Sequence, residues 1–104
     1  MEEIDHIEIN EAFSAQVIAC VKAWNDPDYF NKILKVTSPL GEIQSEKLNP
    51  QGGAIAMGHP VGASGARLVL HASKMLQKHG LNRAVASLCI GGGQGGAILL
   101  EHEV

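Results

Sequence analysis

Two side chains in the second half of the sequence could take part in chemistry at a carbonyl carbon, and both lie beside glycines. His59 stands between Gly58 and Pro60 at the predicted start of a helix, where a neutral imidazole can accept a proton. Cys89 closes a predicted strand just before a run of glycines, where exposed backbone amides can hold an oxyanion. Each residue also has an ordinary structural interpretation, since lone histidines and cysteines most often serve packing.

The other candidate residues carry weaker signals. Asn10 is either the N-cap of a helix or a side chain that faces a pocket, and the sequence leaves both interpretations open. Cys20 falls on an apolar helical stripe and is interpreted as structural. Two cysteines are too few and too far apart for a disulfide framework or a CxxC metal site, so no metal site is expected. The remaining histidines are interpreted as structural or exposed: His6, His71, His79 and His102.

Two glycine patterns match nucleotide-binding motifs only in letters. Gly91, Gly93 and Gly96 satisfy GxGxxG, but a strand follows them where a dinucleotide fingerprint needs a helix. Gly53 and Gly58 satisfy GxxxxG, but His-Pro stands where a phosphate loop needs Lys and Ser or Thr. Neither pattern therefore predicts a nucleotide site.

The elements that must position these residues alternate between strand and helix, which predicts an α/β fold with a mixed sheet layered with helices. Pro60 suits the first helical position and Gly80 suits a helix end. Glycines at 91–96 leave no room for a helical crossover, so the last two strands should be antiparallel. The expected elements are strands at 4–9, 83–90 and 97–101, a short buried strand or tight extended segment at 54–57, and helices at 10–24 and 61–78.

Apolar residues at helical spacing predict which side of each helix is buried. In the first helix the stripe comprises Phe13, Val17, Cys20, Val21 and Trp24, and in the second it comprises Leu68, Val69, Ala72, Met75 and Leu76.

Composition limits the classes of partner. The chain of 104 residues is 45% hydrophobic and 18% charged, which fits one globular domain over residues 1–104. A net charge of −3 disfavours nucleic acid and anionic membranes as partners. No apolar run reaches membrane-spanning length, and Met1-Glu2-Glu3 is unlike a secretion signal. A cytoplasmic protein with reduced thiols is expected.

Three motifs resemble the C-terminal part of thiolases, the acetyl-CoA acetyltransferases and 3-ketoacyl-CoA thiolases. They are NEAF at residues 10–13, GGAIAMGHPVGASGAR at residues 52–67 and CIGGGQG at residues 89–95. Their order matches the family, and the resemblance covers almost the whole chain. Residues 26–47 are the exception and are interpreted as a family-variable insertion.

The resemblance implies a role for each matching residue. Asn10 would hold a water in the oxyanion hole, and His59 would activate the nucleophilic cysteine and help to form the same hole. Cys89 would be the acid and base that moves the α-proton of acetyl-CoA, and the N–H of Gly91 would contribute to the oxyanion site of the acyl-enzyme. Ala12 and Phe13 would lie near the path of the pantetheine. Coenzyme A thioesters would be substrates, and no cofactor is implied.

The resemblance also has a departure. The family's acylated cysteine belongs to an N-terminal domain whose motif does not occur here, so a missing N-terminal domain or chain is an expected partner, and homo-oligomers are expected. The family domain's first strand and helix also have no counterpart before Met1, which predicts a sheet with an open edge. Two alternatives remain: a non-catalytic assembly or CoA-binding module, and a cysteine hydrolase that uses Cys89 and His59 alone.

Overall fold

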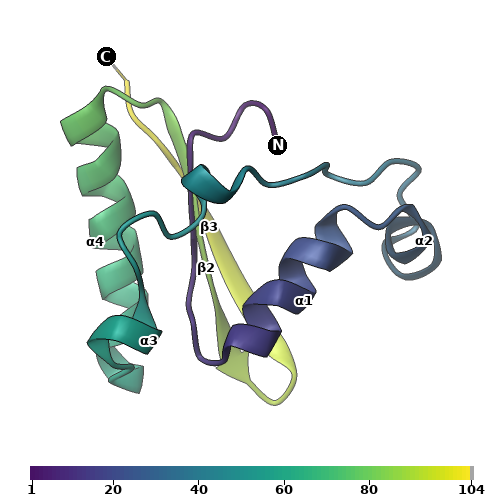
Figure 1. The fold of residues 1–104 in the computed structure, drawn as a ribbon, viewed down its shortest axis with the longest axis horizontal. Coiled ribbons are helices and arrows are strands. Elements are labelled where there is room, and N and C mark those ends of the chain that lie inside the picture. The colour runs from purple at the N-terminus through teal and green to yellow at the C-terminus, as the bar shows by residue number, and fades with distance from the viewer. Residues whose placement is uncertain (104) are drawn as a thin grey trace.

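A computed structural model describes residues 1–103, which form a three-stranded mixed sheet with helices packed on both faces (Figure 1). The strands follow the order β1-β2-β3, with β1 parallel to β2 and β3 antiparallel to β2. The α/β fold with a mixed sheet is therefore as the sequence predicts. The principal elements are β1 (His6–Ile9), α1 (Ser14–Trp24), α2 (Pro27–Tyr29), α3 (Ala54–Met57), α4 (Val61–His79), β2 (Arg83–Gly91) and β3 (Gln94–Glu101).

Strand β1 is buried on both faces. Ile7 and Ile9 pack with Ile43 and with half-buried side chains of α1, whereas the alternate residues His6 and Glu8 point toward α4. Successive side chains of a strand point to opposite faces, and a strand covered by helices on both faces has no exposed side. This explains why every residue of β1 is buried.

Helix α1 begins later than predicted. Its N-cap position is Phe13, with no side-chain cap, and Asn10 instead continues the line of β1 by donating its backbone N–H to Ser87 O. The N-cap prediction for Asn10 is therefore wrong. Phe13 is 74% exposed, so it does not belong to the packed stripe, whereas Val17, Cys20, Val21 and Trp24 do pack against the β1 cluster.

Residues 54–57 form the single-turn helix α3, where the sequence analysis expects a strand. The turn is bounded by Gly53 and by Gly58, whose φ of +90° ends the helical conformation. The Glu11 carboxylate accepts a hydrogen bond from the free N–H of Ile55. Four residues with a helix-forming composition therefore turn once, because a distant side chain satisfies the start of the turn.

Helix α4 follows the prediction closely. Leu68, Ala72, Met75 and Leu76 are buried, Val69 is half-buried, and Gly80 ends the helix in the left-handed conformation. Pro60 takes the N-cap position, one residue before the predicted place. Within residues 1–103, no helix has the length and apolar character required to cross a membrane.

Strands β2 and β3 form the antiparallel hairpin that the glycine run predicts. Gly91, Gly92 and Gly93 all have positive φ, and a register shift lies between Cys89 and Gly91. β3 begins at Gln94, earlier than the predicted residue 97. The outer edge of β3 pairs with no other strand of the described chain.

The opposite edge of the sheet is covered by the chain itself. Leu48 forms an isolated parallel bridge to Ile7, and the backbone N–H of Asn49 donates to Ile7 O at 2.8 Å. Before this bridge, residues 26–47 contain α2, a π-helical turn (Phe30–Leu34) and a 3-10 turn (Ser45–Lys47). Figure 1 shows α2 beyond α1, away from the sheet.

Candidate active site

His59 lies in the short connection between α3 and α4, and its ring is held by the first turn of α4. The ring Nδ1 is 2.6 Å from Oγ of Ser64, a buried residue, and that hydroxyl donates to Pro60 O at 3.3 Å. Because the hydroxyl proton is used on Pro60, Oγ is left to accept a hydrogen bond from Nδ1–H. This arrangement leaves the lone pair of His59 on Nε2, the nitrogen that faces Asn10.

Asn10 extends from the end of β1 beneath His59. Its Nδ2 is 3.4 Å from Nε2 of His59, and the residue has no exposed surface. Its Oδ1 has no hydrogen-bond partner among the described residues. Asn10 is therefore not an N-cap, and its side chain faces His59.

Cys89 and Gly91 share a pocket with His59. The pocket has a volume of about 410 Å³ and is lined by His59, Val61, Leu88, Cys89, Ile90 and Gly91. Its position at the end of β2 follows from the β-hairpin, because Cys89 precedes the glycine turn. Three of the four predicted catalytic residues therefore line one cavity, and the fourth, Asn10, contacts His59. Ala12 and Phe13 are not among the lining residues.

Cys89 also lines a second, larger cavity of about 580 Å³, between α1 and the β2–β3 hairpin. Cys20 lies on the same cavity and accepts a weak hydrogen bond from Gln16 at 3.8 Å. Cys89 is exposed, whereas Cys20 is half-buried. The two cysteines thus differ in their access to solvent.

A group of polar contacts that the sequence analysis missed fixes the approach to His59. Asn49 Nδ2 donates to Ile9 O at 2.8 Å and to Glu11 Oε1 at 3.3 Å, and Asn49 Oδ1 accepts from Ile9 N–H at 2.9 Å. Glu11 in turn accepts from Ile55 N–H at 3.1 Å. A Cβ at Gly53 would come within 2.8 Å of this carboxylate, so a side chain at position 53 would push Glu11 away from its present hydrogen bonds. These bonds join the end of β1 to α3, directly before His59.

The sequence around these supporting residues has recognisable features, but none of them indicates a role near His59. Ser64 lies inside the glycine-rich motif, five residues after His59, at a spacing that places it in the first turn of α4. Asn49 precedes a proline, which indicates a turn and nothing more. Its backbone has a φ of +42°, a conformation that Asn tolerates better than most residues.

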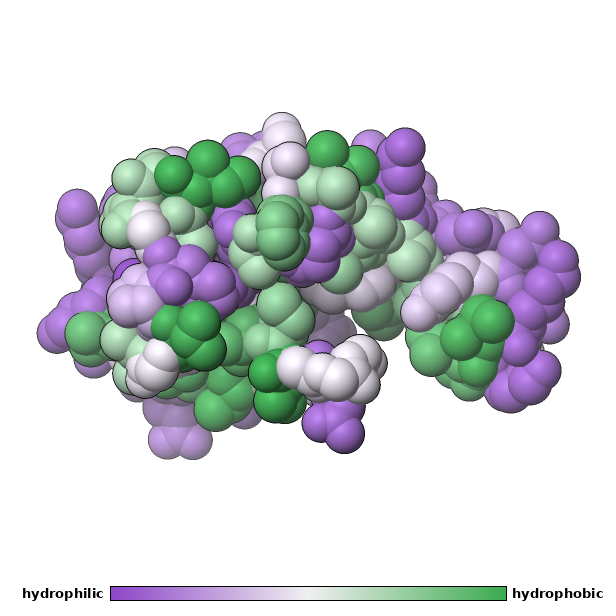
Figure 2. All heavy atoms as spheres, turned by 90° about the horizontal axis from the view of Figure 1, so that it is seen from below, coloured by the Kyte–Doolittle hydropathy of each residue, from purple (hydrophilic) through white to green (hydrophobic). Residues whose placement is uncertain are grey.

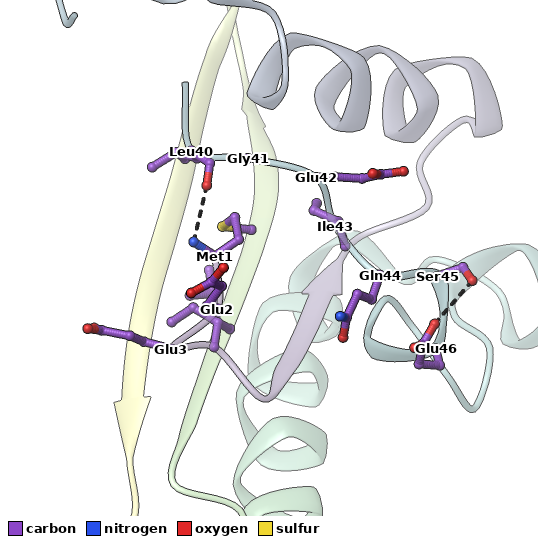
Figure 3. Close-up of a pocket in the computed structure, with 12 residues that line it drawn as sticks. Met1, Glu2, Glu3, Leu40, Gly41, Glu42, Ile43, Gln44, Ser45 and Glu46 are labelled. Carbon is purple, nitrogen blue, oxygen red and sulfur yellow. Dashed lines mark hydrogen bonds between the residues drawn. The ribbon is translucent and has the colours of Figure 1, made fainter. Parts of the chain in front are cut away.

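A larger depression lies elsewhere on the described part of the chain. It has a volume of about 1100 Å³ and lies between residues 1–4 and the segment 40–46 (Figure 3). The N-terminal amine donates to Leu40 O at 3.1 Å across it. None of the predicted site residues lines it. It is lined by four glutamates: Glu2, Glu3, Glu42 and Glu46. An acidic depression of this kind is a poor receptor for an anionic ligand.

Comparison with known proteins gives a consistent result along the chain. The family described as "Thiolase, C-terminal domain" matches residues 1–102. The chain is 45% identical over 102 residues to a beta-ketoadipyl-CoA thiolase of Pseudomonas aeruginosa, which covers 98% of this chain and 22% of that protein. It is 42% identical to an acetyl-CoA acetyltransferase of Syntrophomonas wolfei, over 97% of this chain and 22% of the relative. It is also 42% identical to the mitochondrial trifunctional enzyme subunit beta of Mus musculus, over 97% and 21% respectively. The chain thus spans about a fifth of the length of these relatives.

Proposed function

Because the chain belongs to the thiolase family, as its C-terminal domain, we propose that it supplies the proton-transfer half of a thiolase active site. The reaction is acyl transfer between coenzyme A thioesters, by Claisen condensation or by its reverse, thiolytic cleavage. The residues that would carry it are His59, Cys89, Asn10 and Gly91. The cysteine that becomes acylated would come from the N-terminal part of the enzyme.

The proposed chemistry assigns the α-proton to Cys89. In the condensation, the Cys89 thiolate removes the α-proton of acetyl-CoA, and the resulting carbanion attacks the thioester carbonyl of the acyl-enzyme. The nucleophilic cysteine then leaves as a thiolate. In the cleavage direction Cys89 returns the proton to the departing carbanion. A poised acid and base together with oxyanion donors lower the barrier to forming a carbanion beside a thioester.

His59 has two proposed tasks that its hydrogen bonds support. With Nδ1–H donated to Ser64, Nε2 is free to accept the proton of the nucleophilic cysteine. After protonation, the same nitrogen becomes a donor toward the thioester oxygen. Asn10, whose Nδ2 is 3.4 Å from Nε2, is proposed to hold a water that donates a second hydrogen bond to that oxygen.

One observation carries the proposal. Asn10, His59 and Cys89 come from three separate motifs, more than 25 residues apart in the sequence, and the fold gathers them at one place. If each residue had only a separate structural role, the three would have no reason to lie close together. The acidic depression of Figure 3 is disfavoured as the substrate site, because coenzyme A carries phosphates.

The surface around the site supports a partner in the same enzyme. Figure 2 looks at the end of the molecule that carries α3, the start of α4 and the β2–β3 turn, and hydrophobic residues are exposed over much of it. An exposed apolar surface of this extent usually marks an interface. We propose that the N-terminal part of the thiolase covers it. The exposed residues include Ile55, Met57, Val61 and Ile90, with exposed fractions of 66%, 57%, 78% and 66%.

The test is cleavage of acetoacetyl-CoA, followed at the absorbance of its enolate. The chain alone is expected to be inactive, and activity is expected when a separately expressed N-terminal thiolase segment is added. His59→Ala and Cys89→Ala should each lower the restored kcat by about 10²–10⁴-fold. Cys20→Ala is the matched control and should retain activity. Turnover by the chain alone that Cys89→Ala abolishes would instead make Cys89 a nucleophile.

Ser64 provides a finer test, because its proposed role is to position His59. Ser64→Ala should lower kcat and leave KM for acetoacetyl-CoA little changed, since the hydroxyl orients the ring and does not face the pocket. Ser64→Thr keeps a hydroxyl and should restore part of the rate. An unchanged kcat in Ser64→Ala would refute the positioning role.

A further inference from the structure

A second group of polar residues lies inside the molecule, on the face of β1 that meets α4. His6 and Glu8 lie two residues apart on the same face of the strand, and His71 reaches them from the middle of α4. His6 Nε2 is 2.7 Å and His71 Nδ1 is 2.8 Å from the same oxygen, Oε1 of Glu8. His6 and Glu8 are 1% and 0% exposed, and the His71 side chain is 24% exposed.

The hydrogen-bonding capacity of this group is not used up by its protein partners. Oε2 of Glu8 is buried and has no hydrogen-bond partner among the described residues. A carboxylate oxygen removed from water without a partner is costly, so its burial indicates that another group belongs beside it.

The surroundings of His71 lead to the same conclusion. Its Nδ1 faces the Glu8 carboxylate, and its Nε2 is 3.3 Å from Oε1 of Gln51. Both ring nitrogens therefore face oxygens, but a neutral imidazole has only one N–H to donate. A cation bound at Nδ1 resolves this conflict, because Nε2–H is then free to donate to Gln51. An outer partner of this kind is typical of metal-binding histidines.

We propose that His6, Glu8 and His71 form a binding site for a divalent transition-metal ion, of which Zn²⁺ fits best. The three ligand atoms lie within 4.8 Å of one another. Two imidazoles and one carboxylate suit Zn²⁺, whereas Ca²⁺ and Mg²⁺ prefer oxygen ligands alone. Bonds of about 2.0–2.1 Å in a tetrahedral site place ligand atoms about 3.3 Å apart, so the two distances from the histidine nitrogens to Glu8 Oε1, 2.7 and 2.8 Å, need to open by about half an ångström.

This site is separate from the proposed thiolase centre. None of its three ligands lines the pocket that holds His59 and Cys89. The ligands come from β1 and α4, so a bound ion would join the first strand to the long helix. The His71 side chain is 24% exposed, so it provides the side from which an ion would enter. The site is therefore proposed as structural, and it does not depend on the proposed function.

The experiment measures metal directly. The 104-residue chain is stripped with a chelator, incubated with ZnCl₂, passed through a desalting column and analysed for zinc by mass spectrometry. One Zn²⁺ per chain is expected, together with a Tm that rises with the concentration of free zinc. His71→Ala is expected to lose the ion, whereas His79→Ala, at the exposed end of the same helix, is the matched control and should retain it. Wild-type chain that retains no zinc refutes the site without reference to any variant.

Two further measurements separate this site from zinc bound elsewhere. Gln51→Ala removes only the outer partner and is expected to weaken zinc binding by about 10–100-fold, with the fold intact by circular dichroism. Co²⁺ in place of Zn²⁺ should give visible d–d bands without a thiolate-to-cobalt charge-transfer band. A thiolate band that Cys89→Ala abolishes, or equal zinc retention by wild type and His71→Ala, would overturn the assignment to His6, Glu8 and His71.

Discussion

Replacing Asn49 with alanine should strongly destabilise the fold, because Asn49 takes the place of a neighbouring strand at the outer edge of β1. Its side chain satisfies both the N–H and the C=O of Ile9, at 2.9 and 2.8 Å. Ile9 is 2% exposed, so neither group can turn to bulk water when the amide is removed.

The magnitude follows from three contributions. Two buried backbone groups without partners cost about 1–3 kcal/mol each, and the half-buried position of Asn49 favours the lower part of that range. The longer bond from Asn49 to Glu11, 3.3 Å, adds about 0.5 kcal/mol. The φ of +42° adds about 1 kcal/mol for alanine. We therefore expect Asn49→Ala to lower the free energy of unfolding by about 3–5 kcal/mol.

Two companion variants separate these contributions. Asn49→Gly loses the same hydrogen bonds but accepts the positive φ, so it should be about 1 kcal/mol more stable than Asn49→Ala. Asn49→Asp still accepts from Ile9 N–H but sets a carboxylate against Ile9 O and the carboxylate of Glu11, so it should be less stable than Asn49→Gly. Asn31→Ala, at an exposed position, is the control and should change stability by about 0.5 kcal/mol or less.

The assay is equilibrium unfolding in urea, followed by the fluorescence of Trp24, the single tryptophan. With an m-value of about 1–1.5 kcal/mol/M for a domain of this size, the midpoint of Asn49→Ala should fall by at least about 2 M. A loss below about 1 kcal/mol would show that water replaces the amide, and the edge-covering role would be wrong. Equal stability of the alanine and glycine variants would refute the contribution from φ.

Two further predictions concern acid stability and thiol reactivity. Hydrogen bonds from the backbone N–H groups of Arg83 and Asn82, at 3.0 and 2.9 Å, hold the pKa of Asp5 below its ordinary value. The charged form is thus favoured in the fold, so the stability that Asp5 contributes is present above its ordinary pKa and is lost as the pH falls through the lowered one. The difference in free energy of unfolding between wild type and Asp5→Asn, measured in urea, should accordingly become smaller as the pH falls from neutral to below the ordinary pKa of Asp5. A difference that does not change with pH would contradict this. Brief iodoacetamide treatment should alkylate exposed Cys89 before half-buried Cys20, as measured by mass spectrometry with Cys20→Ala as the control, and preferential labelling of Cys20 would contradict the assignment of the two environments.

Local signals predicted most of the second half of the fold. The start of α4 after Pro60, its end at Gly80 and the antiparallel hairpin each depend on residues within a few positions, and each was confirmed within one to three residues. The predicted site residues came from short motifs, and their shared pocket follows from two junctions. His59 lies just before α4, and Cys89 lies just before the glycine turn of β2 and β3.

What the sequence did not reveal depends on contacts between distant residues. The helical turn α3 was read as a strand because its stabilising carboxylate, Glu11, lies 44 residues away from Ile55. Asn49 reads as a turn residue until its partner Ile9, 40 residues earlier, is known. His6 and His71 were each interpreted as isolated histidines, since 63 residues separate Glu8 from His71.

The contact between Glu8 and His71 belongs to an interface that also links the proposed metal site to the proposed active site. The buried polar residues of the described chain are His6, Glu8, Asn10 and Ser64, and all lie where β1 meets α4 or the turn before it. Along β1, Glu8 and Asn10 are separated by about 6.6 Å. Along α4, Ser64 and His71 lie seven residues apart, which is about two turns and about 10.5 Å, so they share the helix face toward the strand.

The pairing of this interface leaves little freedom for the strand to slide. Glu8 contacts His71 of α4. Two residues further along the chain, Asn10 contacts His59, whose ring is held by Ser64. A shift of β1 by one residue would turn Glu8 and Asn10 to the other face of the sheet, against the apolar side chains of α1. A metal ion or hydrogen bonds at Glu8 would therefore stabilise the register of β1. The same register brings Asn10 into contact with His59. A metal bound at His6, Glu8 and His71 would in this way hold the geometry of a site whose chemistry it does not enter.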